Sequence, residues 1–328
     1  MDASTSTMIR RWARLILGCL CLASSAQVAG QGFPSKEVRI IVPQAPGGAS
    51  DALARLVGAK LAERWGQPVI VENKIGANGN IGTSEAAKAP ADGHTLLLTY
   101  AGTHATSPAL YANLPWDPIR DFAAVAPVAT LPFVMVVNSK LPAKNLRELI
   151  DLAKTRELHN ASPGSGSMNH LLGEQFSRSA GVKMSHVPYK GISQALTDLI
   201  GERVEVTFSS LQSVVPHLKA GTLRAIALTS AKRSELMPEL PTLAELGLKD
   251  FDVNPWFGVL APAATPPALV ARVNRDINDV INAPDVKARF TGIGAVPLAM
   301  SPEAFDAQIK SDLARWGNVV RYVGIKID

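Results

Sequence analysis

The chain has 328 residues and a formal net charge of +5, with 33 Lys and Arg against 28 Asp and Glu. The cations are spread along the sequence and form no stripe of the kind that binds nucleic acid, which excludes a nucleic-acid partner. A chain of this length is more than one hydrophobic core usually supports, so we expect two lobes.

The first 30 residues are built as a secretion signal. Three arginines precede an apolar run from Leu15 to Ala23, which is shorter than the roughly 20 apolar residues that span a bilayer. Small residues follow and place a signal-peptidase site near residues 26–30. We therefore predict a signal peptide over residues 1–30 and an exported, periplasmic mature protein.

Both cysteines, Cys19 and Cys21, lie in this segment, so the mature chain carries no thiol. That excludes disulfides, cysteine nucleophiles and thiolate metal sites. Removal of the segment, whose net charge is +2, leaves a mature charge of +3.

Short β-branched runs and amphipathic runs alternate over the next seventy residues or so. The pattern predicts strands over residues 38–42, 69–71 and 95–100, with helices between them that end at Gly66 and near Ala89. Such β-α alternation predicts a parallel sheet covered by helices.

A second series begins with a strand over residues 134–137 and predicts another α/β lobe. A helix over 145–154 and a Gly/Ser loop over 162–167 follow, and the next helix has an apolar face that starts at Met168. Further strands are predicted over residues 185–188, 204–208 and 223–229.

The end of the chain predicts a strand over residues 256–261 and two amphipathic helices, the second with Ser301 as N-cap. Their apolar faces need a core, so we place them on the first lobe. Lobe 1 is then discontinuous, residues 31–133 and 258–328, and lobe 2 covers residues 134–257. The chain crosses between the lobes near residues 134 and 257, which makes a hinge.

Four loops are candidates for a ligand site, because ligands of open α/β sheets sit beyond the carboxyl ends of the strands. In lobe 1, loop 43–51 has two glycines at a helix start that attracts anions, and loop 100–107 is rich in hydroxyl groups. In lobe 2, loop 162–170 is another Gly/Ser turn before a helix, and Tyr189-Lys190-Gly191 offers a phenol and a cation. The alternatives are an ordinary tight turn capped by Ser50 or Asp51 for loop 43–51, a polar surface turn for loop 100–107, and a solvated surface lysine for Lys190.

The sequence patterns of enzymes are absent. Gly76, Gly79 and Gly82 do not have the GxGxxG spacing, and neither a GxSxG elbow nor an HExxH motif occurs. We therefore predict no catalytic residue, no metal and no cofactor. An exported hydrolase or lyase with His104 or His170 as base is the less favoured alternative.

Several segments match one known family in order along nearly the whole mature chain. They include Pro34 to Pro43, Ala45 to Gly48, Asp92 to Leu97, His186 to Gly191, Thr229 to Ser234 and Trp256 to Gly258. This set resembles the substrate-binding family of tripartite tricarboxylate transporters, also called the Bug receptors.

The resemblance implies an α/β, two-lobed periplasmic-binding-protein fold of the Venus flytrap, type II class, with two hinge crossings. It implies a receptor without catalytic activity, which captures a di- or tricarboxylate or an aromatic acid for membrane permease subunits. We expect a monomer. A sensor that reports ligand occupancy to a membrane signalling partner would share the same fold and site, so this alternative stays open.

The resemblance also implies ligand contacts from the four loops. The residues are Ala45, Gly47, Gly48, Ala49, Ser50, Asp51, Tyr100, Ala101, Gly102, Thr103, His104, Gly164, Ser165, Gly166, Ser167, Asn169, Tyr189, Lys190, Gly191 and Ser209. After the strand predicted over 204–208, many relatives have an acidic residue that can pair with an ammonium group, whereas this chain has Ser209-Ser210-Leu211-Gln212. Its absence favours a carboxylate without an ammonium group.

Overall fold

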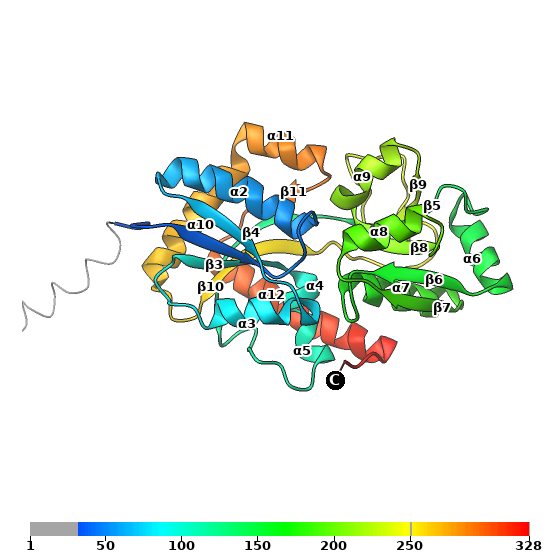
Figure 1. The fold of residues 1–328 in the computed structure, drawn as a ribbon, viewed down its shortest axis with the longest axis horizontal. Helices are drawn as coiled ribbons and strands as arrows, with labels where there is room; N and C mark the ends of the chain where they lie inside the picture. The colour runs from blue at the N-terminus through cyan, green and yellow to red at the C-terminus, as the bar shows by residue number, and fades with distance from the viewer. Residues whose placement is uncertain (1–31, 250, 328) are drawn as a thin grey trace, which may run out of the picture.

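The computed structural model describes residues 32–249 and 251–327 as two α/β lobes, each built on its own mixed sheet (Figure 1). The predicted signal peptide lies outside the described residues. Among the helices in the described part of the chain, none has both the length and the apolar character that crossing a bilayer requires.

The sheet of lobe 1 has six strands, and three of them confirm the predicted β-α alternation. β1 runs parallel to β2 and to β3. In spatial order the strands are β11 (Val296–Pro297), β4 (Phe122–Thr130), β10 (Trp256–Pro262), β3 (Thr95–Tyr100), β1 (Val38–Val42) and β2 (Val69–Asn73).

The parallel part of the sheet is limited to β1, β2 and β3, the strands of the predicted alternation. β10 runs antiparallel to both β3 and β4, and β11 runs antiparallel to β4. The chain leaves this sheet along β4 and returns along β10, so the two strands must run in opposite directions.

Helices cover both faces of the first sheet, so its central strands β3 and β10 are buried on both sides. On β1, Ile40 packs in one core cluster with Leu53 of α2, whereas its neighbour Ile41 packs in another with Phe305 of α12. Figure 1 shows α2, α10 and α11 over one face and α3, α4, α5 and α12 over the other. These helices are α2 (Ala49–Trp65), α3 (Asn80–Ala87), α4 (Ala101–His104), α5 (Ser107–Leu110), α10 (Pro267–Asn282), α11 (Pro284–Gly292) and α12 (Pro302–Val323), with the 3-10 turn η1 (Ala77–Gly79) before α3.

The sheet of lobe 2 has five strands. β6 runs parallel to β7 and β8, and β5 runs antiparallel to β8 and β9. In spatial order they are β7 (Met184–Pro188), β6 (Leu158–Ser162), β8 (Val206–Ser210), β5 (Phe133–Asn138) and β9 (Leu223–Leu228). The strand predicted over residues 204–208 therefore runs two residues further, and Ser209 lies within it.

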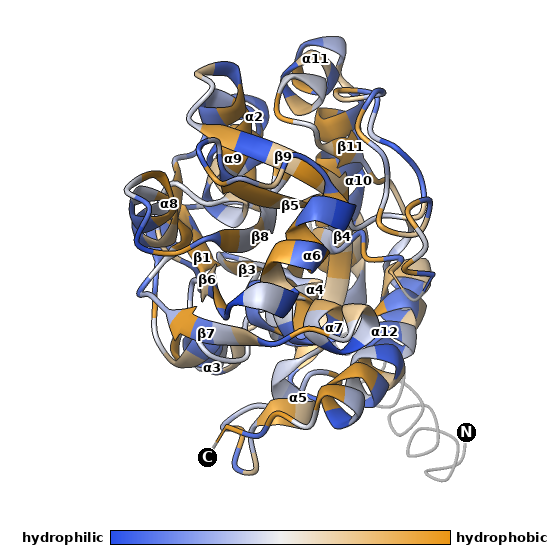
Figure 2. Ribbon diagram, turned by 90° about the vertical axis from the view of Figure 1, so that its right-hand side faces the viewer, coloured by the Kyte–Doolittle hydropathy of each residue, from blue (hydrophilic) through white to orange (hydrophobic). Residues whose placement is uncertain are grey.

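Four helices pack on this second sheet. They are α6 (Leu146–Thr155), α7 (Met168–Ala180), α8 (Ile192–Ile200) and α9 (Leu211–Lys219). α6 buries Leu146, Leu149 and Ala153, a spacing that places them on one helix face. Figure 2 shows hydrophilic and hydrophobic residues together on this helix, as expected for an element with one buried face.

Several helix ends agree with the capping signals in the sequence. The hydroxyl of Ser301 accepts the N–H of Ala304 at 3.2 Å and so caps α12. At the end of α2, Gly66 has the left-handed backbone that favours glycine, with φ of 65°, and its N–H donates to the carbonyl of Ala62.

The chain passes between the two sheets twice, once from β4 to β5 and once from β9 to β10. The two passages lie side by side, because the N–H of Leu131 donates to the carbonyl oxygen of Pro255 at 3.3 Å. The lobe boundaries at residues 134 and 257 stay a prediction, which this pairing supports. We propose the paired passages as the hinge.

One buried amide ties α10 to the first sheet and supplies a test of the fold. Asn274 is 6% exposed, and its Nδ2 donates to the carbonyl oxygens of Val125 on β4 and of Met300, at 2.7 and 2.9 Å. Replacing Asn274 by Ala should lower the free energy of unfolding by about 1–3 kcal/mol, because the buried carbonyl of Val125 loses its side-chain donor, whereas the carbonyl of Met300 keeps a bond from Asn278. Urea unfolding measures this change.

The control is Asn282→Ala on the same helix, since Asn282 is exposed and donates only to the carbonyl of Asn278. Its effect should stay within about 0.5 kcal/mol. Equal losses in the two variants would contradict the role assigned to Asn274.

Candidate ligand-binding site between the lobes

A cavity of about 510 Å³ lies between the lobes, a size typical of small-molecule sites. Its walls are formed by segments that follow β1, β2 and β3 in lobe 1 and β6, β7 and β8 in lobe 2. These are the carboxyl ends of the strands in each parallel unit, where ligands of open α/β sheets bind.

All four predicted loops reach this cavity, although not every predicted residue lines it. The predicted residues that line the cavity are Ala45, Gly48, Ala49, Ser50, Tyr100, Thr103, Gly164, Ser165, Ser167, Asn169, Tyr189, Lys190, Gly191 and Ser209. The predicted residues that do not line it are Gly47, Asp51, Ala101, Gly102, His104 and Gly166.

The start of α2 forms part of the first-lobe wall. Gly48 is its N-cap and makes no side-chain capping bond. The first backbone N–H groups of a helix have no acceptor inside the helix and carry the positive end of its dipole. Because Gly48, Ala49 and Ser50 all line the cavity, this helix start can donate hydrogen bonds to an anion there.

Asp51 supports this helix start from outside the cavity. Its carboxylate accepts the N–H of Gly47 at 3.1 Å and pairs with Arg55 at 2.9 Å. Burial acts to raise the pKa of Asp51, but the bonds from Arg55 and Gly47 outweigh burial and hold that pKa below its usual value. The carboxylate is therefore charged at neutral pH and has its counterion on the same helix.

Tyr100 and Thr103 bring hydroxyl groups from the end of β3 to the cavity. Thr103 Oγ1 accepts a hydrogen bond from Gln44 Nε2 at 2.9 Å. Burial has the largest effect on the pKa of Tyr100, and it outweighs the lowering by the backbone N–H of Met168, which belongs to lobe 2, and by Thr103. Burial raises the pKa of Tyr100 to about 12, so the phenol is neutral.

His104 lies in the core of lobe 1 rather than at the cavity. Its ring is fully buried, stacks on Trp116 with ring centroids 5.2 Å apart, and places Nε2 2.9 Å from the carbonyl oxygen of Pro118. Burial lowers the pKa of His104 to about 4. The neighbouring Gly102 also faces inward, since a Cβ there would meet the Tyr100 ring at 2.3 Å.

In lobe 2, the cavity wall includes the turn of residues 163–167, which joins β6 to α7 and is called here the 163–167 turn. Gly164 and Gly166 have φ of 142° and 77°, values that favour glycine. Ser167 caps α7: its hydroxyl accepts the N–H of His170 at 3.3 Å and donates to the carbonyl of Gly164 at 2.7 Å. Asn169 is fixed by a hydrogen bond to the carbonyl of Phe208.

Two further lobe-2 residues, Lys190 and Ser209, bring polar groups to the cavity. Among the described residues that line the cavity, Lys190 carries the one charged side chain. Ser209 is fully buried, and its hydroxyl has no hydrogen-bond partner among the described residues. The hydroxyl of Tyr189 is engaged elsewhere and donates to Asp198 at 2.9 Å.

The two lobes touch around the cavity. Asn78 of lobe 1 donates through Nδ2 to the carbonyl of Gly166 at 3.1 Å, and a Cβ on Gly191 would lie 3.0 Å from the Cβ of Ala45. Arg178 of α7 also donates to the carbonyl of Val323, at the end of α12, at 2.9 Å. The lobes are therefore closed over the cavity.

Sequence reasoning missed a whole loop and several further lining residues, both apolar and polar. The loop from Ile75 to Gly79 follows β2 and lines the cavity, and the rule of strand carboxyl ends would have found it. The other missed lining residues are Pro43, Gln44, Tyr111, Phe133, Pro163, Ile192, Ser210, Ser213, Phe257 and Ile327. No metal site is found, since no three His, Cys, Asp or Glu residues of the described chain are placed to hold an ion.

Two α/β lobes, joined by two passages and closed over a cavity at the strand ends, define a two-lobed periplasmic binding protein. The chain belongs to the tripartite tricarboxylate transporter family receptors, whose family model matches residues 53–325. The resemblance predicted from the sequence is thus confirmed.

Relatives of known name and structure agree with this assignment. The chain is 37% identical over 306 residues to protein BugT of Bordetella pertussis, covering 92% of this chain and 94% of that protein. The solved R. palustris protein Rpa4515 with adipate is 36% identical, has a TM-score of 0.87, and is matched over 90% of this chain and 99% of that one. MatC from Rhodopseudomonas palustris with bound malate is 32% identical, with a TM-score of 0.83 and coverage of 88% and 100%.

The contact between Gly191 and Ala45 predicts that bulk at residue 191 hinders closure. Gly191 has an extended backbone that any residue adopts, so Gly191→Val should fold normally while its side chain presses on Ala45. Overpacking of this kind costs about 1–3 kcal/mol, which corresponds to an affinity loss of about 5- to 150-fold. Calorimetric titration with the carboxylate that stabilises the protein most measures the loss.

The matched control is Gly48→Ala, whose added Cβ would make ordinary contacts at 3.6 Å with the carbonyl oxygen of Ala45 and 4.0 Å with Ile192. Its affinity should stay within about twofold of the unchanged protein, a difference of less than 0.5 kcal/mol. An unchanged affinity in Gly191→Val would show that the closed contact is not part of ligand binding.

Proposed function

We propose that this chain is an exported periplasmic receptor, which captures a small carboxylate without an ammonium group for the permease of a tripartite tricarboxylate-type transporter. One observation carries the proposal: a helix start and several hydroxyl groups converge on a cavity whose described lining includes a single charged side chain, that of Lys190.

The chemistry of the cavity wall supports a carboxylate ligand. Backbone N–H groups at the start of α2, the hydroxyl groups of Ser50, Thr103 and Ser209, and Lys190 are all donors. Hydrogen bonds from such donors to an ionised carboxylate are stronger than those between neutral groups. The solved relatives with adipate and with malate point to the same class of ligand.

The same wall disfavours a ligand with an ammonium group. None of the described lining residues is Asp or Glu, and a buried ammonium without a paired carboxylate loses its hydration without compensation. Ser209 occupies a place where an acid would supply that partner. We therefore favour a di- or tricarboxylate or an aromatic acid over an amino acid.

Capture follows from the closed arrangement of the lobes. A ligand stabilises the closed form because only that form contacts it from both sides, through α2 and β3 of lobe 1 and the 163–167 turn of lobe 2. The permease would recognise the closed lobes. A membrane signalling partner in place of the permease is the alternative, and co-purification with detergent-solubilised membranes distinguishes the two.

We propose no catalytic role for the site. The two histidines that a hydrolase or lyase would use have other contacts: His104 is buried against Trp116, and His170 accepts a hydrogen bond from the backbone of Gly166. Turnover of a bound acid by the purified protein would overturn this proposal.

A thermal-unfolding panel of the mature protein tests the ligand class. A ligand at a hundredfold its Kd stabilises the native state by about 2.7 kcal/mol, enough to raise Tm by several degrees. Malate and adipate should raise Tm more than their amino counterparts, aspartate and 2-aminoadipate. The panel is repeated after unfolding, dialysis and refolding, so that a co-purified ligand cannot mask a shift.

A shift with aspartate but not with malate would contradict the ligand class. The refolded protein should respond to at least one di-, tri- or aromatic carboxylate, and the absence of any response would contradict carboxylate binding itself.

Ser209 provides a second test, because its hydroxyl is a buried donor without a protein partner. Ser209→Ala should weaken carboxylate binding by about 1–1.5 kcal/mol, roughly five- to tenfold, since the ligand loses one hydrogen bond. The variant should unfold at the same urea concentration as the unchanged protein, because no bond is lost in the free state.

Ser213→Ala is the control for Ser209→Ala. Ser213 also lines the cavity, but its hydroxyl is paired with the hydroxyl of Ser210 at 3.0 Å, so its loss should matter less to the ligand. Equal affinities in Ser209→Ala and the unchanged protein would remove Ser209 from the site.

A further inference from the structure

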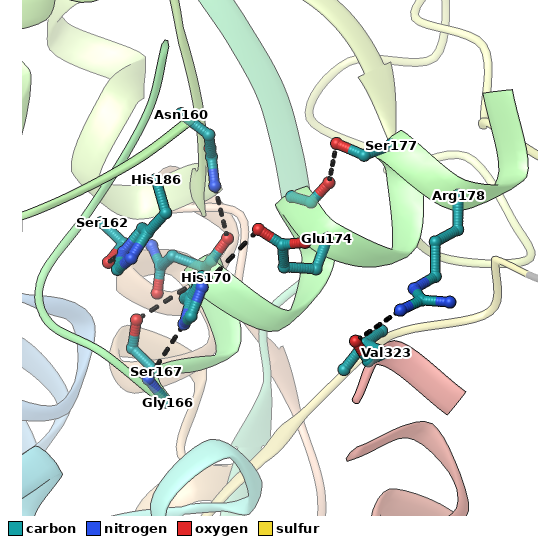
Figure 3. Close-up of polar contacts among 12 residues, drawn as sticks. Asn160, Ser162, Gly166, Ser167, His170, Glu174, Ser177, Arg178, His186 and Val323 are labelled. Carbon is teal, nitrogen blue, oxygen red and sulfur yellow. Dashed lines mark hydrogen bonds and ion pairs between the residues drawn. The ribbon is translucent and has the colours of Figure 1, made fainter. Parts of the chain in front are cut away.

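Two histidine side chains of lobe 2 lie stacked beside the 163–167 turn (Figure 3). The ring centroids of His170 and His186 are 3.6 Å apart, and the ring planes differ by 15°. His170 lies on the first turn of α7, and His186 lies on β7. Neither ring lines the cavity, so the pair joins a helix to a strand immediately outside the ligand site.

His170 holds one end of the turn through its Nδ1 atom. This atom lies 3.1 Å from the backbone nitrogen of Gly166 and accepts its N–H. A backbone N–H can only donate, so Nδ1 carries no hydrogen and the imidazole is neutral, with its hydrogen on Nε2. That Nε2 lies 3.7 Å from the carboxylate of Glu174, which favours this tautomer.

His186 holds the other end of the turn through Ser162. Its Nε2 lies 2.6 Å from Ser162 Oγ, and the same oxygen accepts the N–H of Gly164 at 3.1 Å. Burial is the main cause that lowers the pKa of His186, to about 4. Gly164 and Gly166 are thus each fixed by a bond that leads to one ring of the stack.

The 163–167 turn depends on such bonds, because glycine at residues 164 and 166 leaves its backbone free to adopt other conformations. Pro163, Gly164, Ser165 and Ser167 line the cavity. The carbonyl of Gly166 also accepts the contact from Asn78 of lobe 1. A displacement of this turn would therefore move part of the ligand wall and one contact between the lobes together.

We infer that His170 and His186 are positioning residues of the ligand site, which fix the 163–167 turn in its ligand-ready conformation and do not touch the ligand. The inference rests on the proposed function only in taking the cavity between the lobes as the ligand site.

The first experiment compares two replacements of His170 by hydrogen exchange in the free mature protein. His170→Asn keeps an acceptor near the position of Nδ1, whereas His170→Leu keeps the volume and removes the acceptor. In the Leu variant, exchange of peptides covering residues 163–169 should be at least about tenfold faster, because the Gly166 N–H loses its bond. The Asn variant should stay within about threefold of the unchanged protein.

The matched control is His217→Asn on α9, since no hydrogen bond is recorded for the imidazole of His217 among the described residues. Its exchange pattern should not change. If His170→Leu fails to fold, the pair His186→Gln and His186→Met makes the same comparison at the other end of the turn, because Gln keeps a polar group near Nε2 and Met does not.

The second experiment measures binding of malate and of adipate to the same variants. His170→Leu should lower the affinity for whichever of the two acids binds by at least about tenfold. In His170→Asn the affinity should be within about threefold of that of the unchanged protein. Rescue by Asn separates positioning of the turn from loss of packing, since Asn fills less space than Leu.

Three results would overturn the inference: unchanged exchange in His170→Leu, an Asn variant as impaired as the Leu variant, or faster exchange with unchanged affinity. A different result is that the unchanged protein binds neither malate nor adipate while the exchange results are as expected. That result would count against these two acids as ligands, and the role of His170 and His186 in fixing the turn would still be supported by the exchange rates.

Discussion

The carboxyl ends of the parallel strands in both sheets point toward one cavity, and the rest of the site depends on this constraint. In lobe 1 the helix after β1 starts there, and in lobe 2 the helices after β6, β7 and β8 start there. Helix starts present unpaired N–H groups. Two sheets arranged in this way can offer donors to an anion without placing a cluster of cations in the cavity, and Lys190 alone supplies a full charge among the described lining residues.

The ligand wall is held by groups that do not themselves line it. Asp51 holds the loop before α2 through the N–H of Gly47, and the stacked pair His170 and His186 holds the 163–167 turn. In both lobes a buried side chain fixes a glycine-containing backbone, so donors are in place before the ligand arrives. Such pre-organisation reduces the entropy that binding must overcome.

Strands and loops with a strong local signal were predictable, whereas side-chain direction was not. β1 was predicted from its β-branched run. β6 was not predicted, because its sequence LHNAS has no β-branched residue. β4 was not predicted either, because Pro127 interrupts it next to an irregularity in its pairing with β10. Glycine-containing turns before helices located two of the four loops, and clustered hydroxyl groups or a phenol beside a cation after a strand located the other two. His104 was misplaced because closeness in sequence to a ligand loop does not tell whether a ring faces the cavity or the core. Phe133 and Phe257 reach the site only through the passages between the lobes.

Those two aromatic residues follow directly on the paired passages from Leu131 and Pro255, and both line the cavity. Side chains next to a rotation axis hardly move when two lobes swing, so with the paired passages as the proposed hinge we expect this part of the wall to be shared by the open and the closed forms. An incoming ligand would then meet these two rings, the aromatic floor of the cavity, before the loops close over it. We expect the floor to govern how fast ligands are captured and the loops to govern how long they are retained.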